Sequence, residues 1–312
     1  MGPVVTGGRS STAESRAPGA LRLTTAAEWI AGARPRTLGA AVAPVVVGTA
    51  AASTVGPVVA WRAGAALVVA LSLQVGVNYA NDYSDGVRGT DAERRGPMRL
   101  TASGRAAPAR VKAAAGLAFG VAGVFGAALA LAVDLRLLAV GVAAVLAAVL
   151  YTGGPKPYGY SGLGELVVLV FFGFVATVGS AYVQHRHIPA AAWWGSLAVG
   201  LPACALLLVN NIRDVETDAA VGKRTLAVRL GDGPSRRLFV VVLTGGFVAV
   251  GLASVAAGPW ALLGLAAAPL AVRPAVLVAR GGGTTELVAA LGATSLVELA
   301  VAVLLATGLW LS

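Results

Sequence analysis

A succession of long apolar runs constrains this chain more than any other feature of its sequence. Nine runs are each long enough to form a helix across a hydrocarbon core of about 30 Å. Hydrophobic residues make up 57% of the 312 residues and charged residues only 12%, which excludes an ordinary soluble α/β enzyme. We therefore predict an all-α, polytopic membrane protein. The nine predicted helices are residues 37–55, 57–80, 108–133, 137–153, 162–183, 190–212, 238–257, 259–279 and 285–310.

The distribution of basic residues predicts the orientation of these helices. The net charge of +10 comes from Lys and Arg in short segments between apolar runs, which is typical of the cytoplasmic face of a membrane and not of nucleic-acid binding. With the N-terminus inside, all but Arg62, Arg136 and Arg186 of the 24 basic residues lie in cytoplasmic segments. Residues 1–28 predict a disordered cytoplasmic tail without a targeting signal, followed by one transmembrane domain over residues 29–312.

A polar stretch at the end of the second apolar run is the first candidate site. If the helix continues through it, Asn78, Asn81, Asp82 and Asp85 are spaced i, i+3, i+4 and i+7 and share one helix face. Acidic groups at membrane depth are costly and usually mark a substrate or ion path. The alternative is a solvated helix end followed by an ordinary loop.

A second polar stretch repeats this element at the end of the sixth run. Asn210, Asp214 and Asp218 follow one another at intervals of four residues, again on one face. Two such elements, both at cytoplasmic helix ends, indicate two pseudo-repeated four-helix units whose halves face each other. This repetition makes the solvated-end interpretation a poor explanation of either stretch.

The charges of the two stretches predict a ligand. Opposed carboxylates can hold an anion through Mg²⁺, which binds a few carboxylates together with substrate phosphates. Basic residues follow both stretches and can grip phosphate oxygens. They are Arg88, Arg94, Arg95 and Arg99 after the first stretch, and Lys223 and Arg224 after the second. The implied ligand is a diphosphate whose apolar tail lies between the helices, open to membrane lipid.

Both stretches resemble the two Asp-rich motifs of the UbiA superfamily of intramembrane aromatic prenyltransferases. The motifs are Asn81-Asp-x-x-Asp85 and Asp214-x-x-x-Asp218, the latter followed by Gly-Lys-Arg-Thr at residues 222–225. More narrowly, several segments resemble the 1,4-dihydroxy-2-naphthoate branch of menaquinone synthesis. These segments are residues 34–37, 81–86, 89–91, 151–157 and 223–231.

The resemblance implies transfer of a polyprenyl group from polyprenyl diphosphate to 1,4-dihydroxy-2-naphthoate, with loss of carbon dioxide and diphosphate, at a bacterial plasma membrane. The Mg²⁺ ligands that it implies are Asn81, Asp82, Asp85, Asp91, Asp214 and Asp218. The diphosphate-binding residues that it implies are Arg99, Lys156, Lys223 and Arg224, supported by Asn78 and Asn210. Catalysis would depend on Asp82, Asp85, Asp214, Asp218 and Lys156. For Lys156 the alternative is a basic anchor in a short cytoplasmic turn.

Two other functions remain open from the sequence. A related prenyltransferase could use another aromatic acceptor such as 4-hydroxybenzoate. A cation-coupled secondary transporter would also have repeated halves and intramembrane carboxylates. Against transport, the acids lie at cytoplasmic helix ends and are followed by Arg and Lys, which suits an anionic diphosphate better than a free cation.

Overall fold

The computed structural model describes residues 23–90 and 98–312. Within these ranges the secondary structure is entirely helical, as predicted, with no strand among them. Residues 1–22 of the predicted tail, together with Asp91, Arg94 and Arg95, lie outside the described residues. Helical structure begins at Ala26, where Thr25 and Glu28 form a reciprocal capping box.

The structure contains α-helices, short 3-10 helices and one π-helical segment in the following order along the chain. They are α1 (Ala26–Ala33), η1 (Pro35–Thr37), α2 (Gly39–Ser53), α3 (Ala60–Arg88), α4 (Pro108–Ala132), α5 (Arg136–Leu150), η2 (Tyr158–Ser161), α6 (Gly164–Val168), η3 (Leu169–Val175), α7 (Ala176–His185), α8 (Ala190–Arg213), α9 (Val215–Ala220), α10 (Leu226–Leu230), α11 (Asp232–Ala257), η4 (Pro259–Ala267), α12 (Ala268–Ala279) and α13 (Thr284–Leu311).

The protein is a multi-pass membrane protein, but the predicted number of nine spans is not confirmed. In the described part of the chain, seven helices are long and apolar enough to cross a membrane. An eighth span is possible if α2 is joined to the preceding α1–η1 segment, from which it is bent by 52°. Helix α5 has 15 residues, and at ~1.5 Å per residue it is about 22 Å long, shorter than the hydrocarbon core.

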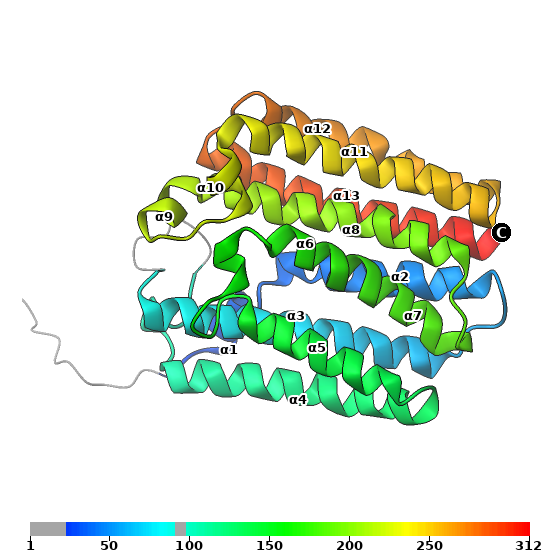
Figure 1. Cartoon of the computed structure of the whole chain (residues 1–312), viewed down its shortest axis with the longest axis horizontal. Coiled ribbons are helices and arrows are strands. Elements are labelled where there is room, and N and C mark those ends of the chain that lie inside the picture. The colour runs from blue at the N-terminus through cyan, green and yellow to red at the C-terminus, as the bar shows by residue number, and fades with distance from the viewer. Residues whose placement is uncertain (1–22, 91–97) are drawn as a thin grey trace, which may run out of the picture.

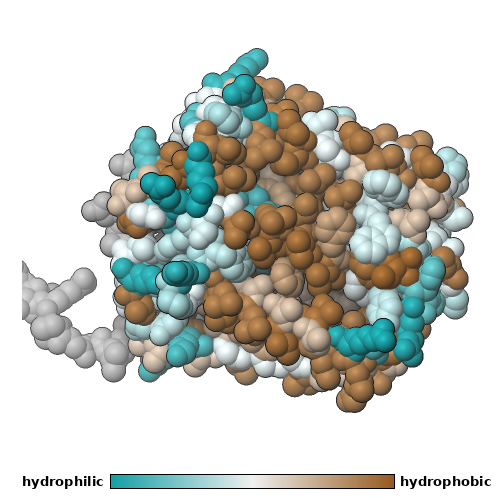
Figure 2. Space-filling model, viewed as in Figure 1, coloured by the Kyte–Doolittle hydropathy of each residue, from teal (hydrophilic) through white to brown (hydrophobic). Residues whose placement is uncertain are grey.

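The long helices lie side by side along the long axis of the molecule (Figure 1). The short helices α9 and α10 gather at one end, and the C-terminus lies at the other. Hydrophobic residues cover the middle of the visible face, while hydrophilic residues gather toward its two ends (Figure 2). This distribution matches the cross-section of a bilayer.

The core is closely packed because many of its residues are small. Its largest buried cluster joins α2, α8, α11 and α13 and contains many Ala side chains. At Gly48 of α2, an added Cβ would overlap the backbone carbonyl oxygen of Thr177 in α7. Small residues thus let neighbouring backbones approach closely, as helices in lipid commonly do.

One span changes its winding partway through. Helices α6 and α7 are joined by η3, a π-helical segment at Leu169–Val175. Gly173 of this segment packs against Gly200 of α8, where an added Cβ would lie 3.3 Å from the Gly200 Cα. The π segment presents Phe171 and Phe172 to the cavity described below, in keeping with the frequent occurrence of π-bulges at functional sites.

Candidate active site

Helix α3 carries the first polar stretch into the site. The helix continues to Arg88 and ends at Gly89, whose φ of 76° provides a left-handed cap. The polar stretch is therefore helical, which is the condition on which the predicted shared face depended. Asn78, Asn81 and Asp85 line one cavity.

Asp82 departs from the predicted shared face. It does not line the cavity, and its carboxylate accepts hydrogen bonds from the backbone N–H groups of Leu100 and Thr101, both at 2.8 Å. At about 100° of rotation per residue, Asp82 lies at the edge of the face defined by the other three polar residues. A small displacement around the helix therefore directs it toward a different neighbour.

The cavity is elongated, with a volume of about 390 Å³. It runs beside α3 from Asp85 to Ala66, which at ~1.5 Å per residue is about 28 Å. Polar side chains line one end, and they are Arg34, Thr37, Gln74, Asn78, Asn81, Asp85, Arg99, Thr152, Asn210, Asn211 and Lys223. Apolar side chains line the rest, including Val45, Val69, Leu129, Leu137, Phe171, Phe172 and Val183. The cavity is thus amphipathic along its length.

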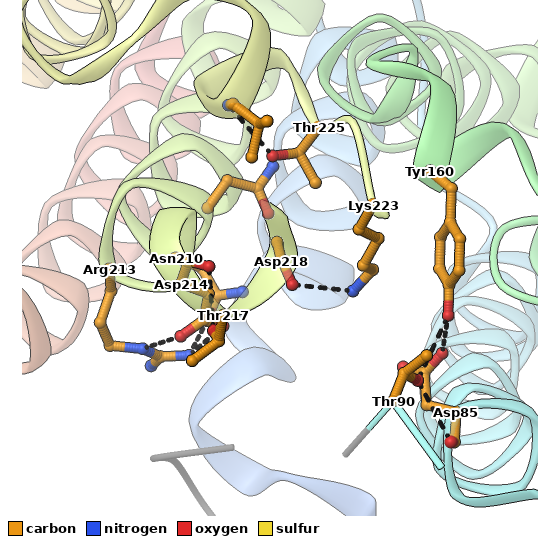
Figure 3. Close-up of polar contacts among 12 residues, drawn as sticks. Asp85, Thr90, Tyr160, Asn210, Arg213, Asp214, Thr217, Asp218, Lys223 and Thr225 are labelled. Atoms are coloured by element: carbon orange, nitrogen blue, oxygen red, sulfur yellow. Dashed lines mark hydrogen bonds and ion pairs between the residues drawn. The ribbon is translucent and has the colours of Figure 1, made fainter. Parts of the chain in front are cut away.

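Tyr160 connects the two polar stretches (Figure 3). Its hydroxyl donates to Asp85 Oδ1 at 2.8 Å. Lys223 Nζ lies 5.0 Å from the centre of its ring, and Arg88 Cζ lies 5.7 Å from it, within the range of cation–π attraction. Burial and the Asp85 carboxylate raise the pKa of Tyr160 to about 12, so the phenol keeps its proton and remains a donor at neutral pH.

The second polar stretch surrounds the end of α8. Backbone hydrogen bonds from Asp214 to Asn210 at 3.2 Å and from Asp218 to Asp214 at 2.8 Å preserve helical spacing across the α8–α9 junction. Arg213 holds Asp214 with two hydrogen bonds of 2.7 Å and donates to Asn210 Oδ1 at 2.9 Å. Asp218 pairs with Lys223 at 3.4 Å, and both aspartates are buried. Figure 3 shows Lys223 between Asp218 and Tyr160.

Of the other predicted site residues, four line the cavity and two do not. Asn81 Oδ1 accepts from the Thr152 hydroxyl at 2.8 Å, and Asn78 Nδ2 donates to the Ala33 carbonyl oxygen at 2.9 Å and to Thr37 Oγ1 at 3.1 Å. Arg99 and Lys223 line the cavity, whereas Lys156 and Arg224 are exposed and do not.

Several cavity residues had no role assigned from the sequence. Asn211 lines the cavity and donates from Nδ2 to Glu165 Oε1 at 2.8 Å. Its only sequence signal is a second amide beside Asn210 in an otherwise apolar run. Arg34 and Thr37 belong to the segment 34–37, which resembles the naphthoate branch. The bend between α1 and α2 brings them to the cavity.

The donor set fits a metal shared with a diphosphate. The described residues contain no group of three or more His, Cys, Asp or Glu side chains arranged to enclose a metal ion. Mg²⁺ retains several waters and binds through one or two carboxylates together with substrate phosphates. Asp85 and Asn81 at the cavity, near the cationic Arg99 and Lys223, suit such an open site better than a closed protein cage.

The fold and the cavity define a polytopic membrane protein with an amphipathic cavity between its helices. The UbiA prenyltransferase family matches residues 41–292, and the chain belongs to this family.

Two relatives support this membership, and a solved structure has the same fold. A 1,4-dihydroxy-2-naphthoate octaprenyltransferase from Mycobacterium tuberculosis is 48% identical over 273 residues, covering 88% of this chain and 93% of that protein. The protein of the same description from Escherichia coli is 39% identical over 261 residues, covering 81% and 85%. A UbiA homologue from Archaeoglobus fulgidus bound to GPP and Mg²⁺ shares the fold with a TM-score of 0.62 at 13% identity, covering 89% of this chain and 99% of that one.

Proposed function

We propose that this protein transfers a polyprenyl group from polyprenyl diphosphate to 1,4-dihydroxy-2-naphthoate in menaquinone synthesis, releasing diphosphate and carbon dioxide and giving demethylmenaquinol. The observation that carries the proposal is the amphipathic cavity, whose polar end is lined by Asn81 and Asp85 of the first stretch and by Asn210 and Lys223 of the second, and whose remaining length is mainly apolar. A prenyl diphosphate has the same division of polarity. The choice of acceptor is supported by the relative that is 48% identical, a 1,4-dihydroxy-2-naphthoate octaprenyltransferase.

The diphosphate would lie at the polar end of the cavity. Arg99 and Lys223 line this end and would bind the phosphate oxygens. We assign Lys156 and Arg224 to the charged membrane surface, because both residues are exposed, unlike the buried Asp214 and Asp218.

The residues that would hold Mg²⁺ come from both polar stretches. They are Asn81 and Asp85 on α3, Asp214 and Asp218 at the α8–α9 junction, and Asp91, with Asn78 and Asn210 in support. A bound Mg²⁺ supplies charge neutralisation at the diphosphate and stabilises the leaving oxygen. Tyr160 would orient Asp85 through its hydrogen bond to Oδ1, so that the other carboxylate oxygen, Oδ2, would bind the metal.

The reaction follows from this arrangement. The bond between the prenyl C1 and the diphosphate oxygen breaks, and its electron pair leaves with the diphosphate, which Arg99 and Lys223 hold. The ring carbon that bears the carboxylate then forms a bond to C1. The bond from that carbon to the carboxyl group breaks, carbon dioxide leaves, and the electron pair restores the aromatic ring. The apolar side chains along the cavity exclude water from the allylic cation.

The proposed orientation places the N-terminus and the polar end of the cavity on the cytoplasmic side of a bacterial plasma membrane. Basic residues support it, because Arg99, Arg213 and Lys223 all surround the polar end. Positively charged segments are retained on the cytoplasmic side of multi-pass proteins.

The test is prenyl transfer by the purified protein in liposomes. Labelled polyprenyl diphosphate is offered with 1,4-dihydroxy-2-naphthoate or with 4-hydroxybenzoate, each with Mg²⁺ or EDTA. We expect metal-dependent product and carbon dioxide release with the naphthoate alone. Product with the benzoate alone would refute the acceptor, and product from neither would refute prenyl transfer.

Matched variants locate the reaction at the proposed site. Asp85→Asn should abolish most of the activity. Asp232→Asn provides the control, because Asp232 pairs with Arg236 on α11 and its side chain is 56% exposed. Full activity of the Asp85→Asn protein would contradict the proposed metal site.

A further inference from the structure

Asp82 is buried, yet it faces away from the cavity. Only 1% of the residue is exposed, and each carboxylate oxygen accepts a backbone N–H, Oδ2 from Leu100 and Oδ1 from Thr101. Hydrogen bonds of 2.8 Å to an ionised acceptor are strong ones. Asn78, Asn81 and Asp85 of the same helix line the cavity, while Asp82 does not. Its carboxylate is thus committed to the chain segment that passes beside α3.

This segment, residues 98–106, is called the Arg99 loop below. Leu100 of the loop is fully buried and packs so closely that a Cβ on Gly32 of α1 would lie 2.6 Å from its Cδ1. One turn beyond Asp82, a Cβ on Gly86 would lie 2.5 Å from Thr101 Cγ2. The Asp82 carboxylate therefore binds the loop to α3, and the absence of a side chain at Gly86 lets the loop approach the helix closely.

Arg99 directly precedes the two residues that Asp82 holds. It is 9% exposed and lines the polar end of the cavity together with Asn81 and Asp85. Because the peptide unit joining Arg99 to Leu100 contains the N–H that Asp82 binds, the carboxylate fixes the position from which the Arg99 side chain starts. Moving that peptide would move the guanidinium relative to the α3 carboxylates.

We propose that Asp82 is a positioning residue for the diphosphate site, acting through the backbone of the Arg99 loop, and not a metal ligand. The proposal rests on the proposed function, since it takes Arg99 to bind the diphosphate. In this role the carboxylate supplies two acceptors at one place, which an amide cannot do. An Asn at position 82 would set its NH₂ group against one of the two backbone N–H groups.

The experiment compares Asp82→Asn, Arg99→Ala, the double variant and Asp85→Asn in the full-length protein. Binding of labelled geranyl diphosphate is measured without acceptor, so no turnover occurs, and the Mg²⁺ concentration for half-maximal transfer is measured separately at saturating prenyl diphosphate, because the two ligands bind together. For Asp82→Asn we expect about tenfold weaker geranyl diphosphate binding. The KM for the prenyl diphosphate should rise by the same factor, and kcat should change little. Its Mg²⁺ requirement should stay at the wild-type value, whereas that of Asp85→Asn should rise.

The double variant separates positioning from an independent contribution. If Asp82 acts through Arg99, adding Asp82→Asn to Arg99→Ala should weaken geranyl diphosphate binding little further. Fully additive losses, or an Mg²⁺ requirement raised as much as in Asp85→Asn, would overturn the proposal. Wild-type protein that neither binds geranyl diphosphate nor transfers prenyl groups would instead refute the proposed function.

A second variant tests the loop without altering the carboxylate. Gly86→Ala places a methyl group against Thr101 and should displace the Arg99 loop from α3. We expect weaker geranyl diphosphate binding and an unchanged Mg²⁺ requirement, as for Asp82→Asn. If Asp82→Asn fails to fold, this variant carries the test, and wild-type binding by folded Gly86→Ala protein would overturn the proposal.

Discussion

Replacing Gly48 by Ala should destabilise the protein by disturbing the contact between α2 and α7. The new Cβ would overlap the Thr177 carbonyl oxygen and lie 2.9 Å from Ser180 Cβ. A backbone oxygen cannot rotate away as a side chain can, so the two helices must separate until the contacts approach about 3.5 Å. Val45 and Ser180 line the cavity, and the separation should therefore also alter the apolar part of the substrate site.

The expected magnitude combines two opposing effects. Overpacking of a well-packed contact costs about 1–3 kcal/mol, and the backbone contact at Gly48 favours the upper end. Ala gains about 1 kcal/mol over Gly in a helix interior, which leaves a net loss of about 2 kcal/mol. At about 2 °C per kcal/mol for a chain of this size, the thermal midpoint should fall by about 4 °C.

The assay is thermal unfolding in detergent, with Gly64→Ala as the matched control. Gly64 lies in α3, is exposed, and a Cβ there would meet nothing within 4 Å. Only the gain in helix propensity applies to it, so its midpoint should stay at or slightly above that of the wild type. A Gly48→Ala midpoint equal to that of Gly64→Ala would refute the packing argument.

The other predictions concern Tyr160. Tyr160→Phe removes the hydroxyl that donates to Asp85, a hydrogen bond to a charged group that contributes about 1.5–3 kcal/mol, so the Mg²⁺ requirement for prenyl transfer should rise about tenfold or more. Tyr158→Phe is the control, because the Tyr158 hydroxyl donates to the Ala147 carbonyl oxygen, and an equal effect in both variants would contradict the role of Asp85. The pKa of Tyr160 is raised to about 12 from about 10 in unfolded chains, so its contribution to stability is fully present below pH 10 and is lost as the pH rises toward 12. Tyr160→Phe should make this alkaline loss of thermal stability shallower, and an unchanged slope would show that Tyr160 does not contribute to it.

The sequence predicted the helical architecture because apolar runs report membrane burial directly. It placed the end of the second helix at residue 80, whereas α3 continues to Arg88. Polar residues there face a cavity, and hydropathy alone cannot tell such residues from a loop. The predicted helix over residues 137–153 extends past Leu150, where α5 ends. The chain then turns, and Gly154 adopts a φ of 76°. The sequence of the π-helical segment η3 contains no pattern from which it could be predicted.

The site was predicted in part for a similar reason. The spacing of Asn78, Asn81 and Asp85 predicted that they share one face of a helix, because helical periodicity determines which residues share a face. Spacing cannot say what lies opposite that face, so the contact of Asp82 with the Arg99 loop required the tertiary structure. Tyr160 and Asn211 reach the polar end from other segments, and nothing in their local sequence distinguishes them from interfacial or packing residues.

The acidic residues of the site already have donors from the chain itself. Arg213 holds Asp214, Lys223 pairs with Asp218, and Tyr160 donates to Asp85. Removing one partner from a buried ion pair costs about 3–5 kcal/mol, so these aspartates would be costly to bury without such donors. In the proposed function, binding of the diphosphate with Mg²⁺ is then an exchange of partners. Asp214 and Asp218 turn to the metal, Asp85 keeps Tyr160 as the donor to its Oδ1, and Lys223 turns from Asp218 to the phosphate oxygens. Because the carboxylates and Lys223 each keep a partner of opposite sign, the exchange limits the cost of unpaired charge in the cavity.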